Sequence, residues 1–237
     1  MIRAVLFDFN GVIVDDEPLH FELFREVLKK EGVNLAREDY YSKYLGMDDH
    51  DCFAAALRDQ KAEASEERIN DLIGRKAKLY EERMRKTPPF VPGVSDFIRK
   101  LAVTHFLAVV SGALRREVEM LLQRAGVKDC INVVVAAEDV QHGKPDPEGF
   151  EKAFQQLNRD YVASSEMLLP QECLVIEDSS WGIEAATRAG MPAVGVTTSY
   201  PEKDLTGAIG YLHDFQGLEA EAWLQEISQR IPSQDAR

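Results

Sequence analysis

The sequence predicts an α/β protein whose parallel sheet is interrupted once by an inserted helical segment. The first observation is a series of short apolar runs that alternate with helical patterns in the second half of the chain. The second is the stretch 16–87, which follows the first apolar run and contains helical patterns without a convincing strand. The alternation is typical of βαβ units, in which helices cover both faces of a parallel sheet.

Five apolar runs are expected to form buried strands, because each is short, rich in aliphatic residues and bounded by turn or polar residues. They are residues 4–7, 106–110, 133–137, 173–176 and 193–196. Residues 209–212 are expected to add a short edge strand. Helices are predicted at 114–125, 148–157, 183–189 and 218–231. The first of these carries Leu114, Val118 and Leu121 on one face and stops at Gly126.

The stretch 16–87 is predicted to be a separate helical cap domain. Apolar stripes indicate three helices, around Leu23, Phe53 and Leu72. A normal crossover between parallel strands needs only about a dozen residues, so this stretch is too long to be one. The core is therefore assigned to 1–15 and 88–237, and the two linkers between core and cap are expected to act as a hinge.

The composition limits the class of partner. A net charge of −13 argues against a nucleic-acid ligand, which favours a basic surface, but leaves a small phosphorylated ligand open. No apolar run approaches the roughly 18 residues of a membrane span, and no signal peptide precedes the first strand. Cys52, Cys130 and Cys173 are far apart, as expected of reduced thiols in a cytoplasmic protein. The oligomeric state is not indicated.

Polar side chains stand at the ends of several predicted strands. Asp8, Ser111 and the pair Glu177 and Asp178 each follow an apolar run, and Lys144 lies in the turn GKPDP. The carboxyl ends of parallel strands meet at the edge of the sheet where ligands bind. Adjacent buried carboxylates repel each other unless a cation lies beside them, and Mg²⁺ prefers oxygen ligands. These residues therefore predict a magnesium site with a lysine beside it.

The order and spacing of these motifs, beginning with DFNGV at 8–12, resemble those of the haloacid dehalogenase (HAD) superfamily. Within it, the chain is similar to the β-phosphoglucomutase-like phosphatase branch with a helical C1-type cap. The resemblance covers the chain to about Val196. It implies a Rossmann-like, HAD-like core and a Mg²⁺-dependent phosphohydrolase that acts on a small phosphorylated metabolite.

The resemblance also implies roles for individual residues. Asp8 would be the nucleophile that forms an aspartyl-phosphate, and Lys144 would neutralise the reacting anions. Ser111 and the backbone at Gly112 would bind the phosphoryl group. Asp8, Asp178 and the backbone carbonyl of Asn10 would hold Mg²⁺, with Glu177 binding it directly or through water. In the cap, His20 would touch substrate or steer a proton, or simply pack at the hinge, and Gly46 would belong to the substrate loop.

The cap loop also bears on the kind of reaction. A mutase must hold the second phosphate of a bisphosphate, which favours a basic residue, whereas this loop carries Asp48, Asp49 and Asp51. A monophosphate hydrolase is therefore favoured over a β-phosphoglucomutase-like mutase. The paired carboxylates disfavour a dehalogenase, and the absence of lysine at the loop tip disfavours a phosphonatase.

Asn10 departs from the family pattern, which has a second aspartate at this position. An amide cannot exchange a proton at neutral pH, so general acid–base help worth roughly 10²–10⁴-fold would be lost. Metal and phosphate binding would persist. The chain is then a slow natural enzyme, a catalytically impaired phosphate-binding or interaction protein on the same scaffold, or a variant engineered to trap the enzyme.

Overall fold

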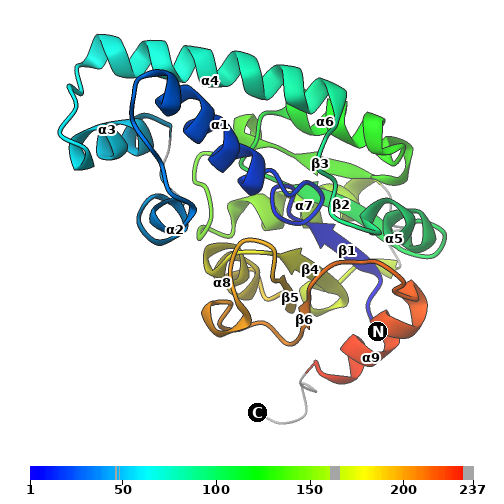
Figure 1. The fold of residues 1–237 in the computed structure, drawn as a ribbon. Helices are drawn as coiled ribbons and strands as arrows, with labels where there is room; N and C mark the ends of the chain where they lie inside the picture. The colour runs from blue at the N-terminus through cyan, green and yellow to red at the C-terminus, as the bar shows by residue number, and fades with distance from the viewer. Residues whose placement is uncertain (46, 48, 161–165, 232–237) are drawn as a thin grey trace. The chain divides into compact units, whose positions relative to one another are not determined.

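The computed structural model describes residues 1–45, 47, 49–160 and 166–231. The chain divides into two compact units, which we describe separately. The sheet unit combines Met1–Asp15 with Phe90–Arg237, and the helical unit is Asp16–Pro89. Figure 1 shows the strands and helices of both units along the colour gradient.

The sheet unit is built on six parallel strands, which confirms the predicted fold class. Their order across the sheet is β3-β2-β1-β4-β5-β6. The strands are β1 (Ala4–Phe7), β2 (Phe106–Val110), β3 (Val133–Val135), β4 (Cys173–Glu177), β5 (Ala193–Val196) and β6 (Tyr211–Leu212). β1 lies at the centre, between β2 and β4, and is completely buried.

Three strands differ in length from the prediction: β6 begins at Tyr211 and not at residue 209, and local hydrogen bonds decide where β3 and β4 stop. β3 ends at Val135, and the chain turns into the short 3-10 helix Ala137–Asp139. The carboxylate of Asp139 accepts a hydrogen bond from the backbone N–H of Ala136 at 2.7 Å, which closes that turn. β4 continues one residue further than predicted, since Glu177 pairs with Gly195 of β5.

Helices cover both faces of the sheet. On one face, α7 (Glu148–Asp160) and α8 (Ser180–Arg188) share a core with the strands that includes Leu6, Val110 and Phe150. On the other, Phe97 of α5 (Val94–Leu101) meets Phe7 of β1, with ring centroids 6.3 Å apart. The ring of Trp223, in α9 (Ala220–Gln229), lies edge-on to Phe97, with centroids 5.4 Å apart.

Helix α6 (Arg115–Ala125) corrects one sequence expectation. Leu114 was expected on its buried face, but it is the residue before the helix and is 57% exposed. The chain is still extended at Leu114, where φ is −68° and ψ is 141°. Helix α5 was not predicted at all, although Val94, Phe97 and Leu101 have helical spacing.

The helical unit contains α1 (Glu17–Lys30), α2 (Arg37–Asp39), α3 (Asp49–Asp59) and α4 (Glu66–Lys86), with a π-helical turn at Tyr40–Tyr44. Its described residues form no strand. It has a hydrophobic core of its own, in which the rings of Phe24 and Phe53 lie 4.8 Å apart. No helix among the described residues combines the length and hydrophobicity needed to cross a membrane. The three cysteines, all in the described part of the chain, form no disulfide, and Cys130 is only half-buried.

The strand order places a switch point beside β1. From β1 the chain builds outward through β2 to β3 on one side, and then crosses back to β4 on the other. At such a point the connections leave the sheet in opposite directions and open a crevice at the carboxyl ends of the two central strands. The switch point here lies between β1 and β4.

Candidate active site

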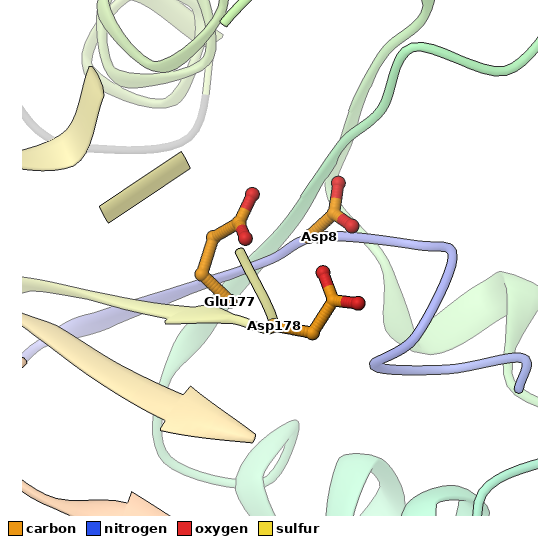
Figure 2. A group of neighbouring side chains, drawn as sticks. All are labelled: Asp8, Glu177 and Asp178. Atoms are coloured by element: carbon orange, nitrogen blue, oxygen red, sulfur yellow. The ribbon is translucent and has the colours of Figure 1, made fainter. Parts of the chain in front are cut away.

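Three carboxylates meet at this switch point. Phe7 of β1 is paired with Ile176 of β4, and the N–H of Asp8 donates to the carbonyl of Ile176 at 2.9 Å. This pairing brings Asp8 level with Glu177 and Asp178. Carboxylate oxygens of the three residues lie within 4.8 Å of one another, and Figure 2 shows the side chains gathered at the strand ends.

Burial dominates the electrostatics of this cluster. It raises the pKa of Asp8 to about 6, an effect that the Lys144 charge reduces and the Glu177 charge increases. Burial, followed by repulsion from Asp8 and Glu177, also raises the pKa of Asp178. A cation placed between Asp8 and Asp178 would therefore stabilise the ionised forms of both carboxyl groups. The donor set, oxygen atoms of converging acidic side chains, is the kind that Mg²⁺ binds, so the residues fit that ion.

Lys144 joins two of these carboxylates from a different part of the chain. Its turn is closed by hydrogen bonds from the Asp146 N–H to the Gly143 carbonyl at 3.0 Å and from the Glu148 N–H to Asp146 at 2.9 Å. Its ammonium donates to Asp8 Oδ1 and, at 2.7 Å, to Glu177 Oε1.

Burial disfavours the ammonium form of Lys144, but two opposite charges outweigh that effect. Attraction to Asp8 and Glu177 raises the pKa of Lys144 above its usual range. The lysine is therefore a fixed positive charge at neutral pH. It lies in contact with the carboxylate that was expected to be the nucleophile.

Ser111 and Gly112 follow β2 and lie on the Lys144 side of the site. Both line a cavity of about 320 Å³, together with Lys144. The hydroxyl of Ser111 accepts a hydrogen bond from the Ala113 N–H at 3.0 Å, which shapes the turn before α6. The first N–H of that helix, on Arg115, donates to the Glu138 carboxylate at 3.0 Å. That donor is therefore already engaged, which narrows the set of backbone groups that could hold a phosphoryl group.

Asn10 and Gly11 form the tight turn after β1. The Gly11 N–H donates to the Val14 carbonyl at 2.7 Å, and Gly11 has φ of 74°, a conformation that favours glycine. A Cβ on Gly11 would lie 1.9 Å from Asp178 Oδ2. Glycine is therefore required here for two reasons, its backbone angle and the close approach of the Asp178 carboxylate.

Two further residues support this half of the site and were missed in the sequence. The hydroxyl of Thr198 donates a hydrogen bond to the carbonyl of Gly11 at 2.5 Å. The side chain of Ser199 forms a hydrogen bond with the Asp178 carboxylate. Both stand just after β5, so the rule that identified Asp8 and Ser111 could also have found them. They hold the turn after β1 and the carboxylate after β4 from a third strand end.

His20 lies in the helical unit, within a polar cluster of that unit. Its Nδ1 is 2.7 Å from the ammonium of Lys76, which has only hydrogen atoms to offer. Nδ1 must therefore accept, and Nε2 carries the hydrogen toward Asp16 Oδ2 at 3.3 Å. Asp16 also accepts from Tyr80 at 2.7 Å. Both ring nitrogens of His20 are thus engaged within the helical unit.

Lys76 is the other residue that sequence reasoning missed. It is only 2% exposed, donates to Asp49 Oδ1 at 2.6 Å and lies 4.2 Å from the centroid of the Phe24 ring. A signal was present, because Lys76 falls three residues after Ile73, on the apolar face of its helix. Asp49, expected to repel a second phosphate, is thus paired. Gly46 and Asp48 lie outside the described residues.

Comparison with known proteins decides the family. The model described as haloacid dehalogenase-like hydrolase matches residues 5–196, most of the chain. This chain belongs to the haloacid dehalogenase-like hydrolase family. The match confirms the family resemblance and the fold inferred from the sequence.

The relatives of this haloacid dehalogenase-like hydrolase include a phosphatase and a mutase. The phosphorylated carbohydrates phosphatase of Thermotoga maritima is 28% identical over 193 residues, covering 81% of this chain and 84% of that protein. The β-phosphoglucomutase of Bacillus subtilis is 26% identical over 204 residues, covering 84% and 85%. The crystal structure of CbbY from Rhodobacter sphaeroides in complex with phosphate has a TM-score of 0.71 at 27% identity, covering 95% of this chain and 100% of that one.

Magnesium is expected to stabilise this haloacid dehalogenase-like hydrolase in the absence of any substrate. An ion present at 100 times its Kd adds about 2.7 kcal/mol, and the midpoint of thermal unfolding should rise by roughly 5–10 °C. A protonated carboxyl does not bind the ion. Because the pKa of Asp8 is raised to about 6, the shift should be full above pH 7 and decline as the pH falls through 6.

The measurement is thermal unfolding at matched ionic strength, with NaCl replacing MgCl₂ in the control. The control is needed because salt also screens the repulsion within a chain of net charge −13 and so raises its stability without binding a specific site. Asp178→Asn keeps the shape of the side chain and should remove most of the magnesium-specific shift. An equal shift in the parent and in Asp178→Asn would place the ion elsewhere.

Proposed function

We propose that this chain is a Mg²⁺-dependent phosphatase that acts on a small phosphorylated metabolite through an aspartyl-phosphate on Asp8. The observation that carries the proposal is the position of the Asp8 carboxylate. It lies at the switch point of the sheet, in contact with the ammonium of Lys144 and next to the carboxylate of Asp178. The proposed nucleophile, a cation and a proposed metal ligand therefore lie close together, which supports phosphoryl transfer at this point.

The first step transfers the phosphoryl group to Asp8. A carboxylate oxygen attacks phosphorus, the bond from phosphorus to the leaving oxygen breaks, and that oxygen takes up a proton from solvent water. The ammonium of Lys144 donates to Oδ1 of Asp8, so Oδ2 is the oxygen that we propose attacks phosphorus. Ser111, with the backbone at Gly112, is proposed to hold a phosphoryl oxygen from the cavity side.

The second step returns Asp8 to its starting state. Water attacks phosphorus and loses a proton to solvent, the bond between phosphorus and Asp8 breaks, and inorganic phosphate leaves. Mg²⁺, when bound by Asp8, Asp178 and the Asn10 carbonyl, with Glu177 direct or through water, supplies positive charge that offsets the approach of two anions. Asn10 can neither give the proton in the first step nor take it in the second, so we propose slow turnover.

A second candidate rests on the same asparagine. With the acid–base carboxylate absent, the scaffold would bind phosphate and metal without turning substrate over. A mutase is a third reading, supported by the relative named β-phosphoglucomutase. We favour hydrolysis because the buried cation of the helical unit, Lys76, is already paired with Asp49. His20 remains our proposed substrate contact in that unit.

A panel of phosphorylated metabolites with Mg²⁺ tests these alternatives. Sustained release of more than one inorganic phosphate per chain, abolished by EDTA, is the result expected of a phosphatase. Conversion of a sugar 1-phosphate to its 6-phosphate without free phosphate would indicate a mutase. Magnesium-dependent binding of phosphate esters with no turnover would reject the enzymatic proposal in favour of a binding protein.

A further inference from the structure

Glu177 is held on both of its carboxylate oxygens by groups other than a metal. Oε1 accepts from the ammonium of Lys144 at 2.7 Å. Oε2 accepts from the backbone N–H of Ser179 at 2.7 Å and from its hydroxyl at 2.8 Å. The side chain is 1% exposed. Figure 2 shows its carboxyl group beside those of Asp8 and Asp178, reaching away from the end of β4.

Gly182 provides the space that this arrangement needs. It is the third residue of α8, and its N–H donates to the Ser179 hydroxyl at 3.1 Å. A Cβ at this position would lie 1.7 Å from Oε1 of Glu177 and 1.9 Å from its carboxyl carbon. Real contacts of that kind do not fall below about 3 Å, so any side chain at Gly182 would displace the carboxylate.

The backbone does not explain this glycine. Gly182 lies within a helix and is absent from the glycines with positive φ, so alanine could adopt its conformation. A glycine inside a helix costs about 1 kcal/mol relative to alanine. Gly74 in α4 shows the contrast, because a Cβ there would meet nothing within 4 Å. The glycine at 182 is therefore required by the carboxylate of Glu177 and not by the helix.

We infer that Gly182 is a positioning residue for the phosphoryl-transfer site. It allows Glu177 to lie against the first turn of α8, and from there Glu177 holds Lys144 against Asp8. The inference rests on the proposed function for its catalytic consequence only. The order of contacts, Gly182 to Glu177 to Lys144 to Asp8, is a property of the folded sheet unit.

A small side chain at 182 should spare the fold and impair the site. The atoms that an added methyl group would meet belong to the end of a flexible side chain, so Glu177 can rotate away without moving the backbone. This rotation would break the hydrogen bonds of Glu177 with Lys144 and Ser179. Lys144 would then keep Asp8 and the Val110 carbonyl, 3.2 Å away, but lose the group that fixes its direction.

The test is a double-mutant cycle on the full chain. Gly182→Ala should lower kcat by roughly 10–100-fold, with KM changed much less, since supporting contacts of this kind have effects of that size. Glu177→Asp is one methylene shorter and leaves room for the new methyl group. In that background Gly182→Ala should lower kcat less than about threefold, because neighbouring effects are not additive. Gly74→Ala, the matched helical control, should keep the parent kcat.

Equal losses from Gly182→Ala in the two backgrounds would overturn the inference, because the glycine would then act without Glu177. Glu177→Gln needs no change at 182 and covers the case in which Gly182→Ala does not fold. Full kcat in Glu177→Gln would equally overturn the inference. Crystal structures give a readout independent of turnover, and the Glu177–Lys144 contact should be lost in Gly182→Ala. If the parent releases no phosphate but that contact is lost as expected, the proposed function fails while the positioning role stands.

Discussion

Asp8→Ala is expected to abolish phosphate release, with a loss of at least roughly 10⁴-fold, because the variant lacks the atom that would bond to phosphorus. No other carboxylate at the site can substitute in place, since Glu177 is held by Lys144 and Ser179 and Asp178 by Ser199. The measurement is release of inorganic phosphate with Mg²⁺ present, using the best substrate of the panel.

The fold should survive this substitution. Burial raises the pKa of Asp8, so its ionised form is held in the site at a cost to stability, and removing it also relieves repulsion with Asp178. Lys144 keeps Glu177 as its partner. Asp8→Asn, which preserves shape without the charge, is the matched control and should be equally inactive. Turnover at the parent rate in either variant would show that Asp8 is not the nucleophile.

Asn10→Asp is expected to raise turnover of alkyl phosphates by roughly 10²-fold or more. The structure already brings together Asp8, Lys144 and Asp178. Proton transfer to the leaving oxygen is the function that no residue of the proposed mechanism supplies. A carboxyl group at position 10 can give that proton and later take one from the attacking water. Magnesium affinity should change little, because the backbone carbonyl is the proposed ligand.

The size of the gain should depend on the leaving group. The leaving group of an aryl phosphate is a phenolate, a weak base that needs no proton, so the gain in turnover should be smallest for these substrates. The leaving group of a sugar phosphate would be an alkoxide, so turnover of sugar phosphates should rise most. The two classes would respond alike only if attack of water on phosphorylated Asp8 limits the turnover of both. Comparing an aryl phosphate with a sugar phosphate in the parent and in Asn10→Asp therefore separates acid catalysis from any general effect of the substitution.

Unchanged sugar-phosphate turnover in Asn10→Asp would contradict our interpretation of Asn10 as a deficit. Another residue would then transfer the proton, and His20 is the first alternative. In this structure its Nδ1 accepts from Lys76 and its Nε2 faces Asp16. His20 would have to exchange one of these contacts before it could act. His20→Gln would then lower turnover in the parent chain.

The fold could be predicted largely from local patterns. β1, β2 and β5 have the predicted bounds, because a run of apolar residues buried on both faces is visible in the sequence itself. The ends of β3 and β4 were misjudged by one or two residues. The Asp139 carboxylate closes the turn after β3, and Gly195 pairs with Glu177, and neither contact can be read from a strand's own residues.

The sequence by itself determined the family and the residues that carry its motifs, from Asp8 to Asp178. Asp8, Ser111 and Asp178 follow strand ends, which are marked locally by a change from apolar to polar residues, and Lys144 is marked by the turn residues around it. Only the tertiary structure decided what each side chain contacts. It joined Lys144 to Glu177, Thr198 to Gly11, and Gly182 to the carboxylate that it accommodates. The physical reason is that such contacts depend on strand order and on distances of a few ångströms between distant segments, and a sequence pattern encodes neither.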